Sequence, residues 1–189
     1  MTEAPLVLVR HGATEWSENG RHTSRTDLPL LPAGRAQAQE LRSGLDQAAF
    51  DRVLCSPLLR ARETCELAGF GDRMEIVDEL REWDYGDYEG LTSAEILARD
   101  PGWNMWVDGF PGGEAPAEVA ARVDSVLAGL DALRVIAFAH GHVLRVLAAR
   151  WVGLGADGGA LLVLSPASIA RLGHEHQRRV IERWNVSEL

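Results

Sequence analysis

The stretch PLVLVRHG, residues 5–12, joins a short apolar run to an arginine, a histidine and a glycine. The continuous apolar run at residues 5–9 is typical of a strand that is buried on both faces of a sheet. Residues 134–139 (RVIAFA) form a second run of this kind, and a histidine and a glycine follow it as well. Ligands of open α/β sheets bind beyond the carboxyl ends of the strands, so we expect a functional site at these two junctions.

Strand-like and helix-like segments alternate along the rest of the chain. Further strands are predicted at residues 51–55, 75–77, 167–172 and 179–184, the last two joined by a polar turn at residues 173–177. Helices are predicted at residues 32–45, 57–68, 92–99, 116–133 and 142–152, the second of them starting with Ser56 as N-cap and Pro57 as its first residue. This alternation predicts an α/β fold, a three-layer α/β/α sandwich with a mostly parallel central sheet and an antiparallel C-terminal edge.

Composition and charge limit the classes of function. The chain has 189 residues, 46% of them apolar, and a formal net charge of −9. This fits one folded domain, residues 1–189, and argues against nucleic acid or an anionic membrane as a partner. No apolar run approaches the roughly 20 residues that span a bilayer. Residues 1–5 lack the pattern of a secretory signal, so we expect a cytoplasmic protein.

The basic residues indicate which ligands a site could bind, and the two cysteines indicate no disulfide framework. All 19 basic residues are arginine and none is lysine, so any permanent side-chain cation in a binding site must be a guanidinium group. The planar guanidinium fork suits carboxylate and phosphate ligands. Cys55 and Cys65 form no CxxC pair, and we expect both to be buried, reduced and unreactive.

Two histidines and two arginines are predicted to meet at one edge of the sheet. Arg10 and His11 follow the first strand, and His140 follows the strand at residues 134–139. Arg60 lies in the first turns of the helix after the strand at residues 51–55. A lone histidine or arginine is usually a surface residue or a satisfied structural one, but the coincidence of four at one edge favours a functional site.

Five motifs in the same order resemble those of the histidine phosphatase superfamily, which has the phosphoglycerate-mutase-like fold. They are RHG at residues 10–12, SPLLRARET at 56–64, EWDYG at 82–86 with YEG at 88–90, PGGE at 111–114, and AHG at 139–141. RHG alone is a weak signal, whereas the ordered set is a strong one. The resemblance implies this α/β/α fold in a single domain, with a lid-like insertion around residues 86–115.

The resemblance also implies a phosphohistidine mechanism. His11 would be the nucleophile, Arg10 and Arg60 would hold the phosphoryl oxygens, and His140, if protonated, would add a third positive donor. Glu82 would act as general acid and then as general base, although a surface carboxylate in a charged loop is the alternative interpretation of its position. This mechanism needs no metal and no organic cofactor.

A second set of residues matches positions that contact phosphate or substrate in the family. These are Ser17, Thr23, Ser24, Tyr85 and Gly141. Ser17 and Ser24 stand where asparagine and glycine are common in the family, and a serine offers fewer hydrogen-bond donors than an asparagine amide. His142 stands where relatives vary, and it either faces the substrate or lies on the surface at the start of a helix.

Other aromatic and histidine residues have two interpretations each. Trp83 and Trp106 either form a wall of the pocket or, more commonly for tryptophan, pack in the core. His22 lies near the phosphate loop, at the periphery of the substrate site. His174 and His176 are predicted to lie in an exposed turn and not to bind metal.

The function implied is hydrolysis of small phosphate monoesters. A cofactor-dependent phosphoglycerate mutase and a non-catalytic module that binds phosphorylated ligands are the alternatives. A mutase carries a lysine and paired arginines after the tyrosine motif, whereas residues 91–101 contain only Arg99 as a cation. Residues 91–113 are rich in aromatic side chains, which predicts a partly apolar lid and not a second anion site. The sequence leaves the oligomeric state open, with a homodimer as one alternative.

Overall fold

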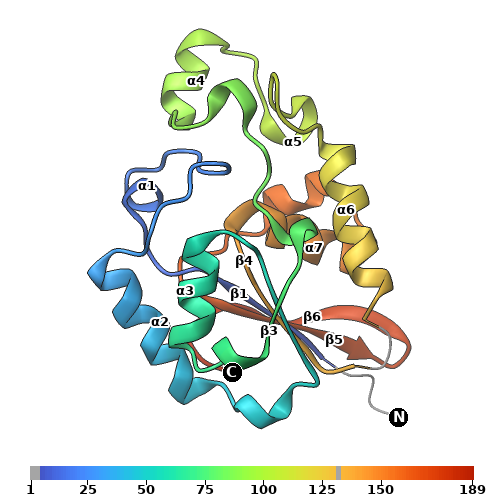
Figure 1. Ribbon diagram of the computed structural model, residues 1–189. Helices are drawn as coiled ribbons and strands as arrows, with labels where there is room; N and C mark the ends of the chain where they lie inside the picture. Colours follow the sequence, from blue (N-terminus) through green and yellow to red (C-terminus); the bar gives the residue numbers. More distant parts are fainter. Residues whose placement is uncertain (1–4, 131–132) are drawn as a thin grey trace.

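The computed structural model describes residues 5–130 and 133–189. A six-stranded sheet in the order β3-β2-β4-β1-β5-β6 forms its centre (Figure 1). The strands are β1 (Leu6–Arg10), β2 (Arg52–Cys55), β3 (Met74–Ile76), β4 (Val135–Ala139), β5 (Ile169–Glu175) and β6 (Arg178–Val186). Strands β1 to β4 are parallel, while β5 and β6 are antiparallel to their neighbours. The predicted mostly parallel sheet with an antiparallel C-terminal edge is confirmed.

Helices cover both faces of the sheet. They are α2 (Pro32–Gly44) and α3 (Leu59–Leu67) on one face, and α6 (Pro116–Ala128) and α7 (Gly141–Trp151) on the other. Alternate residues of β1 point to opposite layers, since Val7 and Val9 pack with α2 and α3 whereas Leu6 and Leu8 pack with α6 and α7. Strands buried on both faces therefore explain the continuous apolar runs, and both cysteines are buried as predicted.

Short helices lie mainly in the connections. They are α1 (Glu15–Glu18), α4 (Ser93–Arg99), α5 (Met105–Asp108), η1 (Gln47–Ala49), η2 (Gly71–Arg73), η3 (Asp78–Leu80), η4 (Gly86–Tyr88) and η5 (Ala156–Leu161). Helices α4 and α5 extend away from the sheet at the top of Figure 1, in the segment predicted as an insertion. In the part of the chain that the structure describes, no helix is both long and apolar enough to cross a membrane.

The start of α3 differs from the prediction. Ser56 and Pro57 precede the helix, which begins at Leu59. The Ser56 hydroxyl lies 2.7 Å from Nε2 of His140, and the Leu59 N–H donates a 2.7 Å hydrogen bond to the carboxylate of Asp27. The first turn of α3 thus receives its acceptor from a distant loop, a contact that local sequence does not reveal.

The end of α6 and the C-terminal hairpin also differ from the predicted boundaries. The helix predicted at residues 116–133 ends at Ala128, and positions 131–132 of that prediction lie outside the described residues. The turn predicted at residues 173–177 is wrong, because β5 and β6 stay paired up to a two-residue turn that begins at His176. The backbone of His176 is in the left-handed region, with φ of 56°.

The two C-terminal histidines therefore have different surroundings. His176 lies in an exposed turn, as predicted. His174 belongs to β5 and packs edge-on against the ring of Trp151, with 5.1 Å between ring centroids. The prediction that both occupy the turn is wrong for His174, because strand pairing continues past it.

Two glycines allow the loop after β1 to lie directly against the start of α2. A Cβ atom added at Gly34 would lie 2.1 Å from the carbonyl oxygen of Ala13, and one added at Gly12 would lie 2.3 Å from the carbonyl oxygen of Gly34. The same loop accepts a 2.9 Å hydrogen bond from the Leu31 N–H through Ala13. The loop that carries His11 is thus positioned by a contact that leaves no room for a side chain.

We predict that Gly34→Ala lowers the free energy of unfolding by about 1–3 kcal/mol, because the new methyl group forces this loop and α2 apart. Denaturant titration measures the change. Gly44→Ala is the matched control, since its Cβ would meet no atom closer than 3.5 Å. An unfolding free energy of Gly34→Ala equal to that of the wild type would contradict the close contact.

Candidate active site

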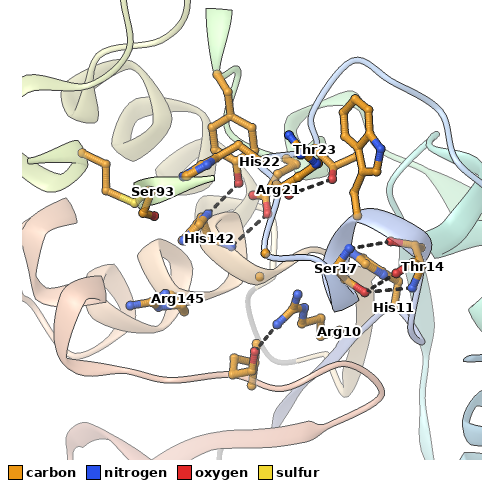
Figure 2. A pocket seen from close by; sticks show the side chains of 17 residues that line it. Arg10, His11, Thr14, Ser17, Arg21, His22, Thr23, Ser93, His142 and Arg145 are labelled. Carbon is orange, nitrogen blue, oxygen red and sulfur yellow. Dashed lines mark hydrogen bonds between the residues drawn. The ribbon is translucent and has the colours of Figure 1, made fainter. Parts of the chain in front are cut away.

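Residues at and just beyond the carboxyl ends of β1 and β4 line one pocket of about 200 Å³ (Figure 2). Eight residues predicted as catalytic or substrate-binding line it: Arg10, His11, Ser17, Thr23, Glu82, Tyr85, Gly141 and His142. Arg60 and His140 are buried and do not line this pocket, although the rings of His11 and His140 lie only 5.2 Å apart between centroids. The parallel sheet therefore brings the predicted catalytic residues together.

His11 is held as a neutral imidazole with one nitrogen free to attack. Its Nδ1 lies 2.8 Å from the carbonyl oxygen of Gly12. A carbonyl oxygen only accepts, so Nδ1 carries the proton and donates it. Burial, together with the charges of Arg60 and Arg10, lowers the pKa of His11 well below its ordinary range. The Nε2 atom consequently keeps its lone pair at neutral pH.

Arg10 and Arg60 are anchored by backbone carbonyl groups. Nη1 of Arg10 donates to the carbonyl oxygen of Leu164. Nη1 and Nη2 of Arg60 donate to Thr26 and Thr23, at 3.3 Å and 3.0 Å. Burial lowers the pKa of both guanidinium groups. The Nε atom of each arginine is buried and has no hydrogen-bond partner among the described residues, so each retains an unused donor.

His140 lies deeper than His11 and is fully buried. Its Nε2 contacts the Ser56 hydroxyl, while its Nδ1 has no partner among the residues described. Burial and the nearby Arg60 and His11 lower the pKa of His140 well below its ordinary range. These surroundings favour a neutral imidazole, in contrast to the protonated donor considered from the sequence.

Glu82 occupies the N-terminus of α7. Its Oε1 accepts hydrogen bonds from the Trp83 and Val143 N–H groups at 2.9 Å and 2.8 Å, and its Oε2 accepts one from the His142 N–H at 3.0 Å. The side chain is only 7% exposed, so the interpretation as a surface carboxylate in a charged loop is wrong. The first turn of α7, directly after His140, therefore holds the carboxyl group in one place at the pocket.

Tyr85 and His142 form a linked pair on the pocket wall. The Tyr85 hydroxyl lies 2.6 Å from Nδ1 of His142. Burial and the neighbouring Glu82 raise the pKa of Tyr85 well above its ordinary range, so the phenol stays protonated. Burial and Arg145 lower the pKa of His142 well below its ordinary range. His142 is only partly exposed and lines the pocket, so its interpretation as a surface residue is wrong.

Two of the predicted substrate contacts have other partners. The Ser17 hydroxyl accepts from the Thr14 N–H at 2.8 Å and donates to the Thr14 carbonyl oxygen at 2.9 Å, so its proton is already used. Ser24 does not line the pocket. It donates to the Glu89 carboxylate at 2.5 Å and accepts from the Tyr85 N–H at 3.2 Å. Ser24 therefore supports the loop of Tyr85 and lies outside the lining of this pocket.

Neither tryptophan considered for the pocket wall reaches it. Trp83 is fully buried in the core, and Trp106 packs beneath the guanidinium group of Arg145. Both are absent from the lining of the pocket around His11. His22 does line it, edge-on to Tyr85 at 4.8 Å between ring centroids.

Several lining residues were not named individually from the sequence, although Ser93 and Met105 belong to the segment at residues 91–113 predicted as a lid. These lining residues are Thr14, Trp16, Gly20, Arg21, Ser93, Met105, Arg145 and Leu164. Arg145 had an available signal, because it lies three residues after His142 and so on the same face of α7. Leu164 follows η5, and no spacing or motif in the sequence indicates that it lines the pocket. Within the described ranges, no three His, Cys, Asp or Glu side chains are grouped to hold a metal ion.

The chain belongs to the histidine phosphatase superfamily, branch 1, whose family model matches residues 6–187. It is 40% identical over 177 residues to an acid phosphatase of Mycobacterium tuberculosis, covering 90% of this chain and 87% of that protein. It is 37% identical over 185 residues to sedoheptulose 1,7-bisphosphatase of Saccharomyces cerevisiae, covering 79% of this chain and 68% of that protein. The solved structure of an open reading frame product of Mycobacterium tuberculosis superimposes with a TM-score of 0.91 at 38% identity, covering 97% of each chain.

We predict that acidification destabilises the fold through its buried histidines, among them His11 and His140. In the unfolded chain each titrates near its reference pKa of about 6.5, whereas burial holds the native pKa of both well below this. As the pH falls below about 6.5, the histidines of the unfolded chain bind protons, whereas those of the native state do not. The free energy of unfolding should therefore fall, by up to about 1.4 kcal/mol per pH unit for each histidine.

Denaturant titrations at pH 7, 6 and 5 measure this slope. His140→Gln should make the slope shallower, whereas His176→Gln, in the exposed turn, should leave it unchanged. A wild-type unfolding free energy that stays constant between pH 7 and pH 5 would exclude this linkage.

Proposed function

We propose that the protein hydrolyses small phosphate monoesters through a phosphohistidine intermediate on His11. The observation that supports this most directly is a set of three buried polar atoms near His11 with no partner among the described residues: Nε of Arg10, Nε of Arg60 and Nδ1 of His140. Buried polar groups nearly always have hydrogen-bond partners, so such a set suits a ligand that supplies several acceptors. A phosphoryl group has three such oxygens.

In the first step, Nε2 of His11 attacks phosphorus while the bond from phosphorus to the ester oxygen breaks. The hydrogen bond from Nδ1 to Gly12 keeps the attacking nitrogen directed into the pocket. Arg10 and Arg60 stabilise the charge on the phosphoryl oxygens. Glu82, in its protonated form, gives its proton to the departing alkoxide.

In the second step, Glu82 is a carboxylate and accepts a proton from water as the water oxygen attacks the phosphohistidine. The bond from phosphorus to Nε2 breaks, which releases inorganic phosphate and restores neutral His11. The three N–H groups that hold Glu82 keep it in position for both proton transfers. One residue can therefore serve both steps.

We predict that the wild type releases inorganic phosphate from aryl and alkyl phosphates and that His11→Ala lowers this by a factor of about 10³ or more, as loss of a nucleophile does. Quenching in alkaline denaturant should trap a phosphoenzyme that is base-stable and acid-labile, and that is missing in His11→Ala. Isomerised phosphoglycerate without phosphate release would instead indicate a mutase. Phosphate binding without any phosphoenzyme would indicate a non-catalytic module.

We predict that Glu82→Ala separates substrates by leaving group. Alkyl phosphates should lose about 10²–10⁴ in kcat/KM, because an alkoxide needs protonation as it leaves. Aryl phosphates should lose much less, since a phenolate leaves without a proton donor. Glu79→Ala, which removes an exposed carboxylate from the same loop, is the control. Equal losses on both substrate types would rule out the acid role.

A further inference from the structure

The pocket contains a cation that the proposed phosphoryl transfer does not use. Most of the partly or fully buried arginines in the described ranges pair with a carboxylate. The exceptions are Arg10, Arg60 and Arg145. The first two are assigned above to the phosphoryl group. Arg145 is thus a third unpaired charge, and it lines the same pocket.

The contacts of Arg145 hold its guanidinium group rigidly. Its Nε donates to the carbonyl oxygen of Gly159 at 2.9 Å, and its Nη2 lies 3.4 Å from that of Ala160. Its Cζ lies 4.6 Å from the centre of the Trp106 ring. These contacts leave Nη1 with no hydrogen bond to a described residue. A guanidinium group fixed in this way loses little conformational freedom when it binds a ligand.

The surroundings of Arg145 favour an anionic ligand. Burial lowers its pKa, which reflects the cost of removing this cation from water without a carboxylate partner. Arg21, the other cation exposed to the pocket beyond Arg10, already pairs with Glu95 at 3.2 Å and donates to Gly90 at 2.6 Å. Arg145 is therefore the cation that remains for a ligand.

Arg145 lies about one helical turn from the residue of α7 that contacts Arg10. Gly141 lies beside Arg10, since a Cβ added there would be 3.3 Å from the Arg10 guanidinium carbon. Arg145 follows four residues later on α7, a rise of about 6 Å along the helix. Figure 2 shows Arg145 and His142 on one side of the pocket, with Thr14 and Ser17 on the other.

We propose that Arg145 forms a second anion subsite, so that the preferred substrates are small phosphate monoesters with a second anionic group a few bonds from the ester. This inference rests on the proposed function. Guanidinium binds carboxylate and phosphate equally well in geometry, so the second group is either of these. The expectation of an apolar lid without such a site is revised, because Met105 lines the pocket from the lid segment whereas the cation comes from α7.

Two substrate pairs test the subsite. Glycerol 3-phosphate and 3-phosphoglycerate differ by a carboxylate, and fructose 6-phosphate and fructose 1,6-bisphosphate differ by a second phosphate. The readout is the ratio of kcat/KM values within a pair, measured as phosphate released. The wild type should prefer the more anionic member of at least one pair by about tenfold or more, as a charge-assisted hydrogen bond provides. Arg145→Gln should reduce that ratio to about one.

The ratio of kcat/KM values does not depend on the stability of the variant, because both substrates of a pair are measured with the same preparation and the fraction of folded enzyme cancels. Arg150→Gln is the matched control on the same helix, since its guanidinium pairs with Asp124, and it should keep the wild-type ratio. The substrate pair whose kcat/KM ratio falls in Arg145→Gln shows whether the subsite binds a carboxylate or a phosphate. A wild-type ratio near one in both pairs, or one that Arg145→Gln does not change, overturns the subsite alone. No phosphate release from any of the four compounds or from an aryl phosphate overturns the proposed function and the subsite with it. Release from the aryl phosphate alone overturns the subsite and leaves the proposed function standing.

Discussion

Strand β4 pairs in parallel with both β1 and β2, and the site depends on this register. Arg10 lies opposite Ala139, and Cys55 lies opposite Phe138. The next residues continue the pairing, because the His11 N–H donates to Ala139 and the Ser56 N–H donates to Phe138, each at 3.0 Å. Three chain segments far apart in sequence thus leave the sheet at one point. A slip of one residue would turn the side chains that follow to the opposite face.

Helix α7 combines several functions in its first turns. Its backbone N–H groups hold Glu82, its Gly141 leaves room for Arg10, and its side chains His142 and Arg145 form part of the pocket wall. The helix follows β4 directly, so the sheet fixes where all of these groups lie. Glu82, Arg10 and the proposed second subsite at Arg145 are therefore all positioned by one helix.

Positive charge is organised locally in this acidic protein. The net charge of −9 belongs to the whole chain, and exposed charges are screened beyond about 8 Å at physiological salt. In the pocket, unpaired guanidinium groups are desolvated and held by carbonyl oxygens of the backbone. Elsewhere most of the partly buried arginines pair with carboxylates, which leaves the positive charge uncompensated mainly where a phosphoryl group would bind.

The sequence by itself determined the alternation of strands and helices, the antiparallel C-terminal edge, and the meeting of Arg10, His11 and His140 at one sheet edge. Apolar runs and parallel strand ends carry that information locally. Only the tertiary structure decided that Ser24 supports a loop and that Arg145 remains unpaired in the pocket. Hydrogen-bond partners distant in sequence decide such roles, and residue type and spacing do not specify those partners.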